Sequence, residues 1–453
     1  MRARDRELTA MSATALAELI AKGTVTAVEA TKAHLDRIDE CDGEIGAWEH
    51  LDREFALRQA AMLDKHRASG AAIGPLHGVP VGIKDIIDVE GLPCEHGTPL
   101  DAGRRPAKDA HLVSRLRQSG AVILGKTVTT ELAVFAPNRT TNPHDATRTP
   151  GGSSQGSAAA VAAHMAPLSV GTQTHGSVIR PASYCGVVGF KPSYGLISRA
   201  GVLTQSPTLD TIGGFSRTIE DVALLTDAMC GFDEDDTAMR LVAAPQLRAT
   251  ATSRPPLRPV LAFVRTPVWD QAEADVHQGF EELVAELGDC IEEVELPSPF
   301  QRAVELQRVI QMAEIARHYG PYYDRGREQL SPTMQGLIEE GRRVLAVDHM
   351  LARDWIKILY AGLEQVFERF DAIVTPAAVG EAPVGLESTG SPVFSTLWTY
   401  CGVPALTIPL LSGSHGMPIG VQLVGARGRD GRLLRTGRWL VEHLNQSAGR
   451  AVA

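Results

Sequence analysis

One almost uncharged stretch in the middle of the chain limits its fold more than any other feature. Residues 151–179 contain small and apolar side chains with a few Ser, Thr, Gln and His residues, but no Lys, Arg, Asp or Glu. Charged residues make up 22% of the whole chain of 453 residues, whose formal net charge is −10. In an acidic protein, a long segment without charge is expected to be buried. The sequence therefore predicts a core that contains this stretch, with the more polar segments around it.

Composition and charge argue against several classes of protein. The acidic balance leaves no basic face for a nucleic acid, and the longest apolar run, residues 157–170, is too short and too broken to span a membrane. The N-terminus is charged and lacks the apolar core of a signal peptide. No C-x-x-C pair occurs, so reduced thiols in a cytoplasmic protein are expected instead of a zinc ribbon or a disulfide framework. The cysteines are Cys41, Cys94, Cys185, Cys230, Cys290 and Cys401.

Hydrophobic periodicity predicts an α/β fold. Apolar residues recur at helical spacing over residues 7–69 and again over 296–370. Residues 111–120 are typical of a helix that leads into a strand at 121–127. Because helices alternate with short β-branched segments, we expect a sheet with helices on its faces. A loop rich in Pro and Gly is expected over 380–394, and two strands before a last helix are expected near the C-terminus.

Three common functional motifs fail when their sequence context is considered. The stretch "GGSSQG" matches G-x-S-x-G through Gly152, Ser154 and Gly156, but a turn-rich segment stands where a nucleophile elbow needs a strand. A phosphate-binding loop needs Lys after its second Gly, whereas Gly156 is followed by Ser157. No H-E-x-x-H or other metal-ligand spacing occurs among the 14 histidines, so no metal is expected.

Lys84 stands inside the apolar run "PVGIKDIIDV", an unusual place for a charged residue. A lysine there either snorkels from an edge strand, pairs with Asp85 or Asp88, or is buried. Two Gly/Ser loops follow later in the chain, "PGGSSQGS" and "GTQTHGS", which taken singly are ordinary turns.

Taken together and in this order, the three segments resemble the amidase signature family. The further stretches "GPLHGVPVGIKDIIDVEGLPCEHGT", "GAVILGKTVTTELA", "LDTIGGFSRTIEDVALL" and "GVPALTIPL…PIGVQLVG" extend the resemblance over nearly the whole chain, and the second of them implies a strand followed by a helix. The resemblance implies an α/β fold: an α/β/α sandwich with a central mixed β-sheet flanked by helices, in a single domain over residues 1–453. Its implied parts are N-terminal helices over 1–70, a catalytic core over 71–230, a variable helical substrate-pocket region over 296–370, and a return to the sheet over 371–453.

The resemblance also assigns the residues of a Ser-cisSer-Lys triad. Ser177 matches the serine nucleophile, Ser153 matches the bridging serine that follows a cis peptide, and Lys84 matches the general base. The backbone N–H groups that match the oxyanion hole are those of Thr174, His175, Gly176 and Ser177. The supporting or substrate-binding residues are Gly152, Ser154, Gln173, Arg180 and Thr130.

This residue set suits acyl transfer. A serine hydroxyl is a poor nucleophile until a base takes its proton, and a lysine with an ordinary pKa of about 10.4 acts as a base only when it is neutral. Burial lowers that pKa, and a shift of about 3 units corresponds to about 4 kcal/mol. The apolar neighbours of Lys84 favour such a shift, and Ser153 would then relay the proton from Ser177. No cofactor is needed for an acyl-enzyme on Ser177.

Three positions depart from the usual family pattern. His175 stands where a small residue is common, and because the triad supplies a base we expect it to shape the pocket instead of acting as the base. Gln173 stands where many members have Asp. Arg180 lies three residues after Ser177, which resembles a bacterial malonamidase-like subgroup with the form "GTQT…SVIRP". Its two interpretations are a partner for a substrate carboxylate and a member of a buried structural ion pair.

The resemblance implies an amidase that hydrolyses the C–N acyl bond of a small-molecule amide, aryl amide or carbamate. Two alternatives stay open: a glutaminase-type subunit of a tRNA-dependent amidotransferase, and an esterase or urethanase with amidase activity. A homodimer is consistent with the family, and no nucleic acid or membrane partner is expected. Tyr319, Tyr322 and Tyr323 either line a leaving-group site or are half-buried aromatic residues near a helix end.

Overall fold

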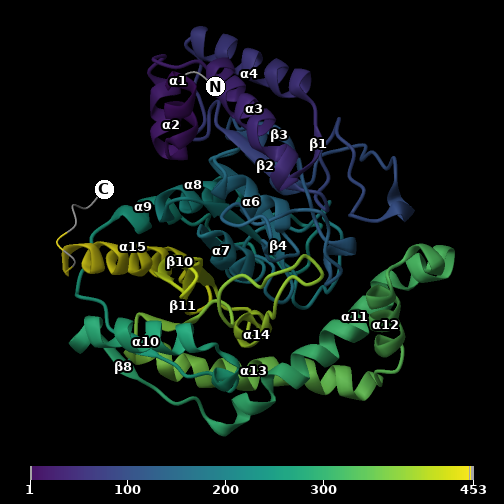
Figure 1. The fold of residues 1–453 in the computed structure, drawn as a ribbon, viewed down its shortest axis with the longest axis vertical. Coiled ribbons are helices and arrows are strands. Elements are labelled where there is room, and N and C mark those ends of the chain that lie inside the picture. Colours follow the sequence, from purple (N-terminus) through teal and green to yellow (C-terminus); the bar gives the residue numbers. More distant parts are fainter. Residues whose placement is uncertain (1–2, 448, 450–453) are drawn as a thin grey trace.

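A mixed sheet of 11 strands runs through the computed structural model, which describes residues 3–447 and 449 (Figure 1). In sheet order the strands are β1 (Trp48–Leu51), β3 (Val122–Thr127), β2 (Pro80–Lys84), β4 (Leu168–Gln173), β6 (Thr211–Ser216), β5 (Val188–Lys191), β10 (Ala405–Ser412), β11 (Pro418–Val424), β9 (Ala372–Pro376), β7 (Leu261–Phe263) and β8 (Ile291–Glu293). Two groups of strands are parallel, β3–β2–β4 and β9–β7–β8, and antiparallel pairs make up the rest of the sheet.

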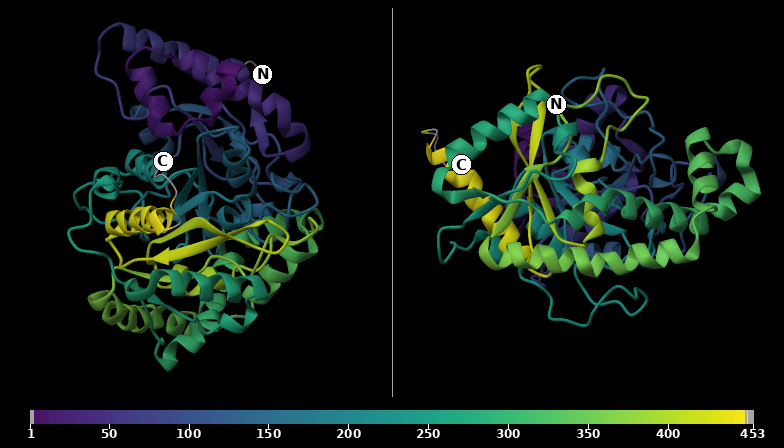
Figure 2. Two further views of the ribbon diagram at one scale, coloured as in Figure 1. Left: turned by 60° about the vertical axis from the view of Figure 1, so that its left-hand side comes forward. Right: turned by 90° about the horizontal axis from the view of Figure 1, so that it is seen from below.

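Helices cover both faces of this sheet (Figure 2). Their bounds are α1 (Ala3–Ala10), α2 (Ala13–Ala21), α3 (Ala27–Ile45), α4 (Arg53–Ala68), α5 (His111–Gln118), α6 (Gln155–Ala162), α7 (Ile179–Cys185), α8 (Ile219–Met229), α9 (Leu247–Thr252), α10 (Ala274–Leu287), α11 (Ala303–Gly326), α12 (Pro332–Gly341), α13 (Ala346–Arg369), α14 (Val393–Tyr400) and α15 (Asp430–Ser447). Apolar residues of α5, α8, α9, α10 and α15 pack on one face, and those of α6, α7, α11, α13 and α14 pack on the other. None of the helices formed by the described residues is long and apolar enough to cross a membrane.

The uncharged stretch forms the centre of the molecule, as its composition predicts. It supplies α6 and β4, and every residue of β4 is buried between β2 and β6. Gly171 in β4 shows how tightly this region is packed, because a Cβ atom there would lie 2.7 Å from both the Phe215 ring and Ser154 Oγ. Only glycine therefore lets the start of α6 approach the sheet so closely.

Two segments differ from what the periodicity predicts. Residues 7–69 are expected to be helical throughout, but Trp48–Leu51 forms the edge strand β1 between α3 and α4. Four residues are too few to show a period of two, and the left-handed Gly46 (φ 65°) ends α3 just before them. The expected loop over 380–394 in fact runs into α14, whose first residue is Val393.

The segment after β3 also differs from its expected form. In place of the helix that the resemblance implies, residues 131–133 make a single 3₁₀ turn (η2, Glu131–Ala133). Leu132 and Ala133 have φ values of 47° and 58°, a left-handed conformation that cannot continue a right-handed helix. Residues other than glycine rarely adopt this conformation, so the surrounding contacts must enforce it.

Candidate active site

Lys84 ends strand β2 with its side chain fully buried. Its Nζ atom donates hydrogen bonds to Ser153 Oγ at 2.7 Å and to Thr172 Oγ1 at 2.9 Å. Strands β2 and β4 are parallel neighbours, with Ile83 paired to Val170. Because parallel strands end at the same edge of a sheet, Lys84 and Thr172 meet there although they are far apart in the sequence.

The surroundings of Lys84 favour its neutral form. No carboxylate of the described residues lies within ion-pair distance of its amine: Asp85 pairs with Lys126 at 2.8 Å and Asp88 pairs with Arg104 at 2.6 Å. The local interpretation of Lys84 as a partner of Asp85 or Asp88 is therefore wrong. Burial lowers the pKa of Lys84 well below its usual 10.5, while the negative charge of Asp210 acts in the opposite direction.

The loop before α6 brings the two candidate serines of the proton relay and its support to Lys84. The peptide between Gly152 and Ser153 is cis. Ser153 accepts a hydrogen bond on its carbonyl from the N–H of Thr130 at 3.3 Å. Ser154 holds this loop to β4, because its hydroxyl donates to the Thr172 carbonyl and accepts from the Thr172 N–H, each at 3.3 Å.

Ser177 lies in the turn between β4 and α7, at a half-buried position. In the part of the chain that the structure describes, its hydroxyl has no hydrogen-bond partner, and no acceptor faces the backbone N–H groups of His175, Gly176 and Ser177. Gln173 shapes this turn, since its Oε1 accepts from the N–H groups of Val178 and Ile179 at 2.8 and 3.0 Å. The turn therefore presents a free hydroxyl beside a row of free N–H groups.

Gln173 performs this capping without a charge. Its Nε2 donates to Thr399 Oγ1 at 2.9 Å, so both ends of the amide are used. An Asp at this position would add a negative charge near the start of α7 and near the free N–H groups. The neutral amide leaves these N–H groups available for an anion.

His175 is a pocket wall and forms no hydrogen bond with Ser177 in the described structure. Its Nε2 lies 2.6 Å from Thr396 Oγ1, and its ring makes an edge contact with Phe135 at 6.1 Å between ring centres. Burial lowers the pKa of His175 to about 3, and the positive charges of Arg180 and Arg308 act in the same direction. The ring is therefore neutral at physiological pH.

Arg180 is a buried cation with an incomplete set of partners. Its Nη2 donates to the Gly152 carbonyl at 2.7 Å and to Thr389 Oγ1 at 3.0 Å. Its Nε and Nη1 atoms are buried and have no hydrogen-bond partner, and no described carboxylate forms an ion pair with it. The interpretation of Arg180 as a member of a structural ion pair is therefore wrong. Burial lowers its pKa only to about 10, so it stays charged at neutral pH.

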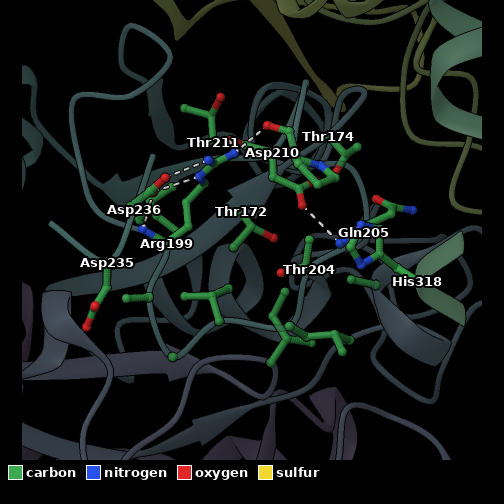
Figure 3. A pocket seen from close by; sticks show the side chains of 18 of the residues that line it. Thr172, Thr174, Arg199, Thr204, Gln205, Asp210, Thr211, Asp235, Asp236 and His318 are labelled. Carbon is green, nitrogen blue, oxygen red and sulfur yellow. Dashed lines mark hydrogen bonds and ion pairs between the residues drawn. The ribbon is translucent and has the colours of Figure 1, made fainter. Parts of the chain in front are cut away.

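Two cavities meet at this site. The narrow one, here the acyl cavity, is lined by Ala133, Val134, Phe135, His175, Gly176, Ser177, Arg180, Gln205 and Gln311. The larger one, here the relay cavity, has a volume of about 340 Å³ and includes Thr172, Thr174 and Asp210 in its wall (Figure 3). Ala133 and Gln205 line both cavities. Thr130 supports this shared wall, because its hydroxyl donates to the Val134 carbonyl at 2.6 Å across the left-handed turn.

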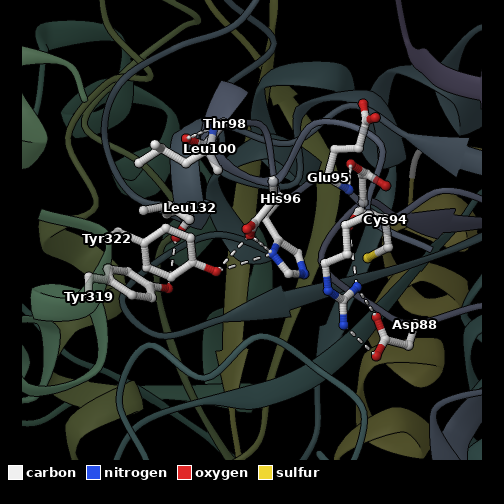
Figure 4. A network of polar contacts seen from close by, with 12 residues as sticks. Asp88, Cys94, Glu95, His96, Thr98, Leu100, Leu132, Tyr319 and Tyr322 are labelled. Carbon is white, nitrogen blue, oxygen red and sulfur yellow. Dashed lines mark hydrogen bonds and ion pairs between the residues drawn. The ribbon is translucent and has the colours of Figure 1, made fainter. Parts of the chain in front are cut away.

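The three tyrosines of α11 lie outside both cavities. Tyr319 donates from its hydroxyl to the Leu132 carbonyl at 2.9 Å, and Tyr322 donates to Asp101 at 2.7 Å (Figure 4). Tyr323 donates to Glu339 at 2.5 Å. These contacts anchor α11 and its neighbours, which supports the interpretation of the tyrosines as packing residues.

Two groups of potential metal ligands also lie outside the cavities. One contains Asp88, Cys94 and His96 (Figure 4), and the other contains Glu49, His50 and Glu95. Their members already have partners: Arg104 binds Asp88, Asp101 lies 2.6 Å from His96 Nδ1, and Arg139 binds Glu49 at 2.8 Å. Neither group is part of the chemistry at Lys84.

Three residues of the site have no signal in the sequence analysis. Thr172 is the second partner of Lys84, Asp210 accepts a hydrogen bond from the Thr174 hydroxyl at 2.5 Å, and Thr396 holds His175. Asp210 stands in the quoted stretch "LDTIGG", and a single charge beside a glycine-rich buried strand is the one feature that marks it. Thr172 and Thr396 have no such mark.

Comparison with known proteins gives one consistent result. The Amidase family model matches residues 29–434. A subunit of the glutamyl-tRNA(Gln) amidotransferase of Salinispora arenicola (strain CNS-205) is 36% identical over 478 aligned residues, which cover 95% of this chain and 96% of that protein. A structure of a vestigial protein complex that reveals the evolutionary origins of an s-triazine catabolic enzyme matches with a TM-score of 0.89 at 27% identity, covering 97% of this chain and 99% of its own. The peptide amidase of Stenotrophomonas maltophilia matches with a TM-score of 0.83 at 28% identity over 98% of both chains. The expected α/β/α sandwich is confirmed by these likenesses.

Proposed function

The chain belongs to the amidase signature family of hydrolases acting on carbon–nitrogen bonds, and from that premise we propose that it cleaves a small amide through an acyl-enzyme on Ser177. The observation that carries this proposal is the pair of Lys84 and Ser153. A fully buried lysine with two hydroxyl partners and no carboxylate is suited to act as a neutral base. Ser153 is the group through which Lys84 reaches the nucleophile.

In the proposed acylation, Ser177 Oγ attacks the amide carbon while its proton passes to Ser153 Oγ and the proton of Ser153 passes to Lys84 Nζ. The distance of 2.7 Å between Lys84 Nζ and Ser153 Oγ allows a proton to move in either direction. Collapse of the tetrahedral intermediate breaks the C–N bond, and the same relay returns the proton to the leaving nitrogen. Water then repeats the sequence on the acyl-enzyme and releases the acid.

The turn over 174–177 supplies the proposed oxyanion hole. The N–H groups of His175, Gly176 and Ser177 precede α7 and have no described acceptor. Backbone donors that are fixed before the reaction stabilise the developing oxyanion without reorganisation, and loss of one such donor costs about 10²- to 10³-fold in rate. Gln173 holds these donors in place through its bonds to the first turn of α7.

We further propose that the acyl group of the substrate carries a carboxylate that binds Arg180. Two nitrogens of this guanidinium lack partners, and the residue lines the same narrow cavity as Ser177. A buried charge without a counter-ion is costly, so a bound carboxylate would supply the missing partner. The amides of Gln205 and Gln311 make the rest of this cavity polar.

A second candidate function is that of a glutaminase component in an amidotransferase. It is favoured by one observation: the relative from Salinispora arenicola, which matches over 95% of this chain, belongs to a glutamyl-tRNA(Gln) amidotransferase. Under this alternative the chain would release ammonia efficiently only together with a second protein. Purification of the chain alone, followed by turnover of a simple amide at a rate that added host-cell extract does not raise, would exclude it.

The same acyl-enzyme also forms from esters and carbamates, so an esterase or urethanase activity is proposed as an accompanying one. Six free cysteines, five of them buried, fit a reducing compartment. We therefore propose that the enzyme works in the cytoplasm, where labelling of thiols in the freshly isolated protein would find them reduced.

The proposed function is tested with a panel of primary amides, anilides, carbamates and esters that have neutral or carboxylate-bearing acyl groups. We expect ammonia or amine release by the native chain, with malonamate turned over faster than acetamide. Mass spectrometry of a slow ester substrate should find the acyl group on Ser177. Ser177→Ala should abolish both signals, whereas Ser253→Ala, at an exposed serine far along the chain, should retain them. Turnover that persists in Ser177→Ala would overturn the proposal.

A further inference from the structure

We propose that the relay cavity binds the leaving amine of the substrate and selects amines that carry a second, positively charged group. This inference rests on the proposed amidase function and adds the class of leaving group to it. It identifies the substrates as amides formed between a small acid and one end of a diamine or a related cationic amine. The position, size and charge of the cavity carry it.

The position of the cavity follows from the path of the proton. The leaving nitrogen must receive its proton from Ser153 or Lys84, so it has to depart on the side of the relay. Thr172, the second partner of Lys84 at 2.9 Å, stands in the wall of the relay cavity. Ser177 and Arg180 stand in the wall of the acyl cavity. A substrate bound across their shared wall would thus place its acid part beside Arg180 and its amine part in the relay cavity.

The size of the cavity exceeds what an ammonia leaving group needs. A water molecule, which is close to ammonia in size, has about 30 Å³ of liquid volume. The relay cavity measures about 340 Å³, which lies within the range of cavities that hold small organic ligands. A leaving amine with several heavy atoms fits this space.

The charge of the wall selects among such amines. Figure 3 shows Asp210, Asp235 and Asp236 around the cavity, with Arg199 as the facing cation. Arg199 is already neutralised, because its Nε and Nη2 donate to the two carboxylate oxygens of Asp236 at 2.8 and 2.7 Å. The remaining charges are negative, since Asp210 and Asp235 form no ion pair within the described structure.

The two remaining carboxylates differ in depth. Asp235 is exposed and has no side-chain partner among the described residues, so its charge stands free at the rim. Asp210 lies deeper and accepts bonds from Thr174 and from the N–H groups of Gln205 and Ser206. Burial raises the pKa of Asp210 to about 6, so it is an anion at neutral pH. A cation that enters past Asp235 thus moves toward a second negative charge.

The cavity also offers hydrogen bonds to an amine. His318, from α11, has a buried Nε2 without a described partner, and Thr204 and Thr211 place hydroxyls in the wall (Figure 3). A buried polar atom without a partner is costly. A ligand N–H or ammonium group would satisfy it, whereas an alkyl chain would not.

The experiment compares three substrates that share one acyl group, chosen as the one whose primary amide is turned over fastest. The leaving amines are ammonia, n-pentylamine and 1,4-diaminobutane; the last two have the same number of heavy atoms and differ in charge. We expect kcat/KM to be about 10-fold higher for the diamine than for pentylamine, because one ion pair at a partly screened site is worth about 1 kcal/mol. Raising the ionic strength should reduce this ratio.

Two variants locate the charge that is responsible. Asp235→Asn should lower the ratio to about 2- to 3-fold and weaken inhibition by free 1,4-diaminobutane. Glu234→Gln, which removes the neighbouring exposed carboxylate that does not line the cavity, should leave the ratio as in the native chain. A native enzyme that prefers the pentylamide, or an equal loss of the ratio in both variants, would overturn the inference while leaving amidase function intact. Absence of turnover for every primary amide would overturn both.

Discussion

Lys84 and Lys126 are two fully buried lysines on the neighbouring strands β2 and β3, and their surroundings are opposite. Lys126 Nζ lies 2.8 Å from Asp85 Oδ1 in a fully buried ion pair. Lys84 Nζ has only the hydroxyls of Ser153 and Thr172. The comparison teaches that burial alone does not make a lysine a base. Burial without a counter-charge does, because it removes the stabilisation of the ammonium form.

The largest expected effect is on catalysis, from Lys84→Ala. Loss of the general base should lower kcat/KM about 10⁴-fold. The free energy of unfolding should fall little, because the side chain makes no ion pair in the described structure. Amide turnover and urea denaturation, run on the same preparation, measure the two effects. A folded Lys84→Ala protein with more than a tenth of native activity would remove Lys84 from the mechanism.

The reverse result is expected for Lys126→Met. Removing one partner of a buried ion pair leaves Asp85 charged and alone, which should lower the free energy of unfolding by about 3–5 kcal/mol. Activity per folded molecule should stay close to native below the denaturation midpoint. Adding Asp85→Asn should restore part of the lost stability. If Lys126→Met were as stable as the native chain but inactive, the roles of the two lysines would be the reverse of those argued here.

The next effect is a shift of the pH profile in Asp210→Asn. Lys84 must be neutral to act, so kcat/KM should rise with pH and level off above the pKa of Lys84, which burial places well below 10.5. The negative charge of Asp210 raises that pKa, so removing it should move the rising limb to lower pH. Profiles of kcat/KM for a primary amide measure the shift, with Glu234→Gln as the matched control. A limb that moves to higher pH in Asp210→Asn would contradict the assignment.

The smallest expected effect comes from His175→Ala. The ring is neutral above a pKa of about 3 and forms no hydrogen bond with Ser177 in the described structure, so kcat should change less than about 5-fold, as for loss of a packing contact. KM should change more than kcat, because the ring lines the acyl cavity. The pH profile should keep its shape. A loss comparable to that of Lys84→Ala would show that the base lies in the loop itself.

The order and type of most elements could be predicted from the sequence because they depend on local patterns. The charge-free stretch over 151–179 predicts the buried centre of the sheet, and the periodicity over 296–370 predicts α11 to α13. The strand β1 could not be predicted in this way, since its four residues form a strand only by pairing with β3. The left-handed turn at Leu132 and Ala133 is likewise held by contacts from distant segments.

The candidate site shows the same division. The resemblance names Lys84, Ser153 and Ser177, and these assignments stay predictions until variants are measured. Thr172 could not be named, because nothing local distinguishes a threonine whose hydroxyl faces a lysine on the next strand. The contradicted pairing of Lys84 with Asp85 has the same cause, since neighbours in a strand point to opposite faces of the sheet.

The pairing of β2 with β4 decides when this chain becomes reactive. Lys84 and Thr172 are 88 positions apart, and the atoms around the amine come together only when both strands lie in register. Before that moment, the chain carries an ordinary ammonium with a pKa near 10.5 and an ordinary serine. A nascent or misfolded chain therefore has no amide-cleaving chemistry. The hydrolytic activity appears as a property of the completed sheet, and recovery of turnover during refolding is a direct report that its central strands have joined.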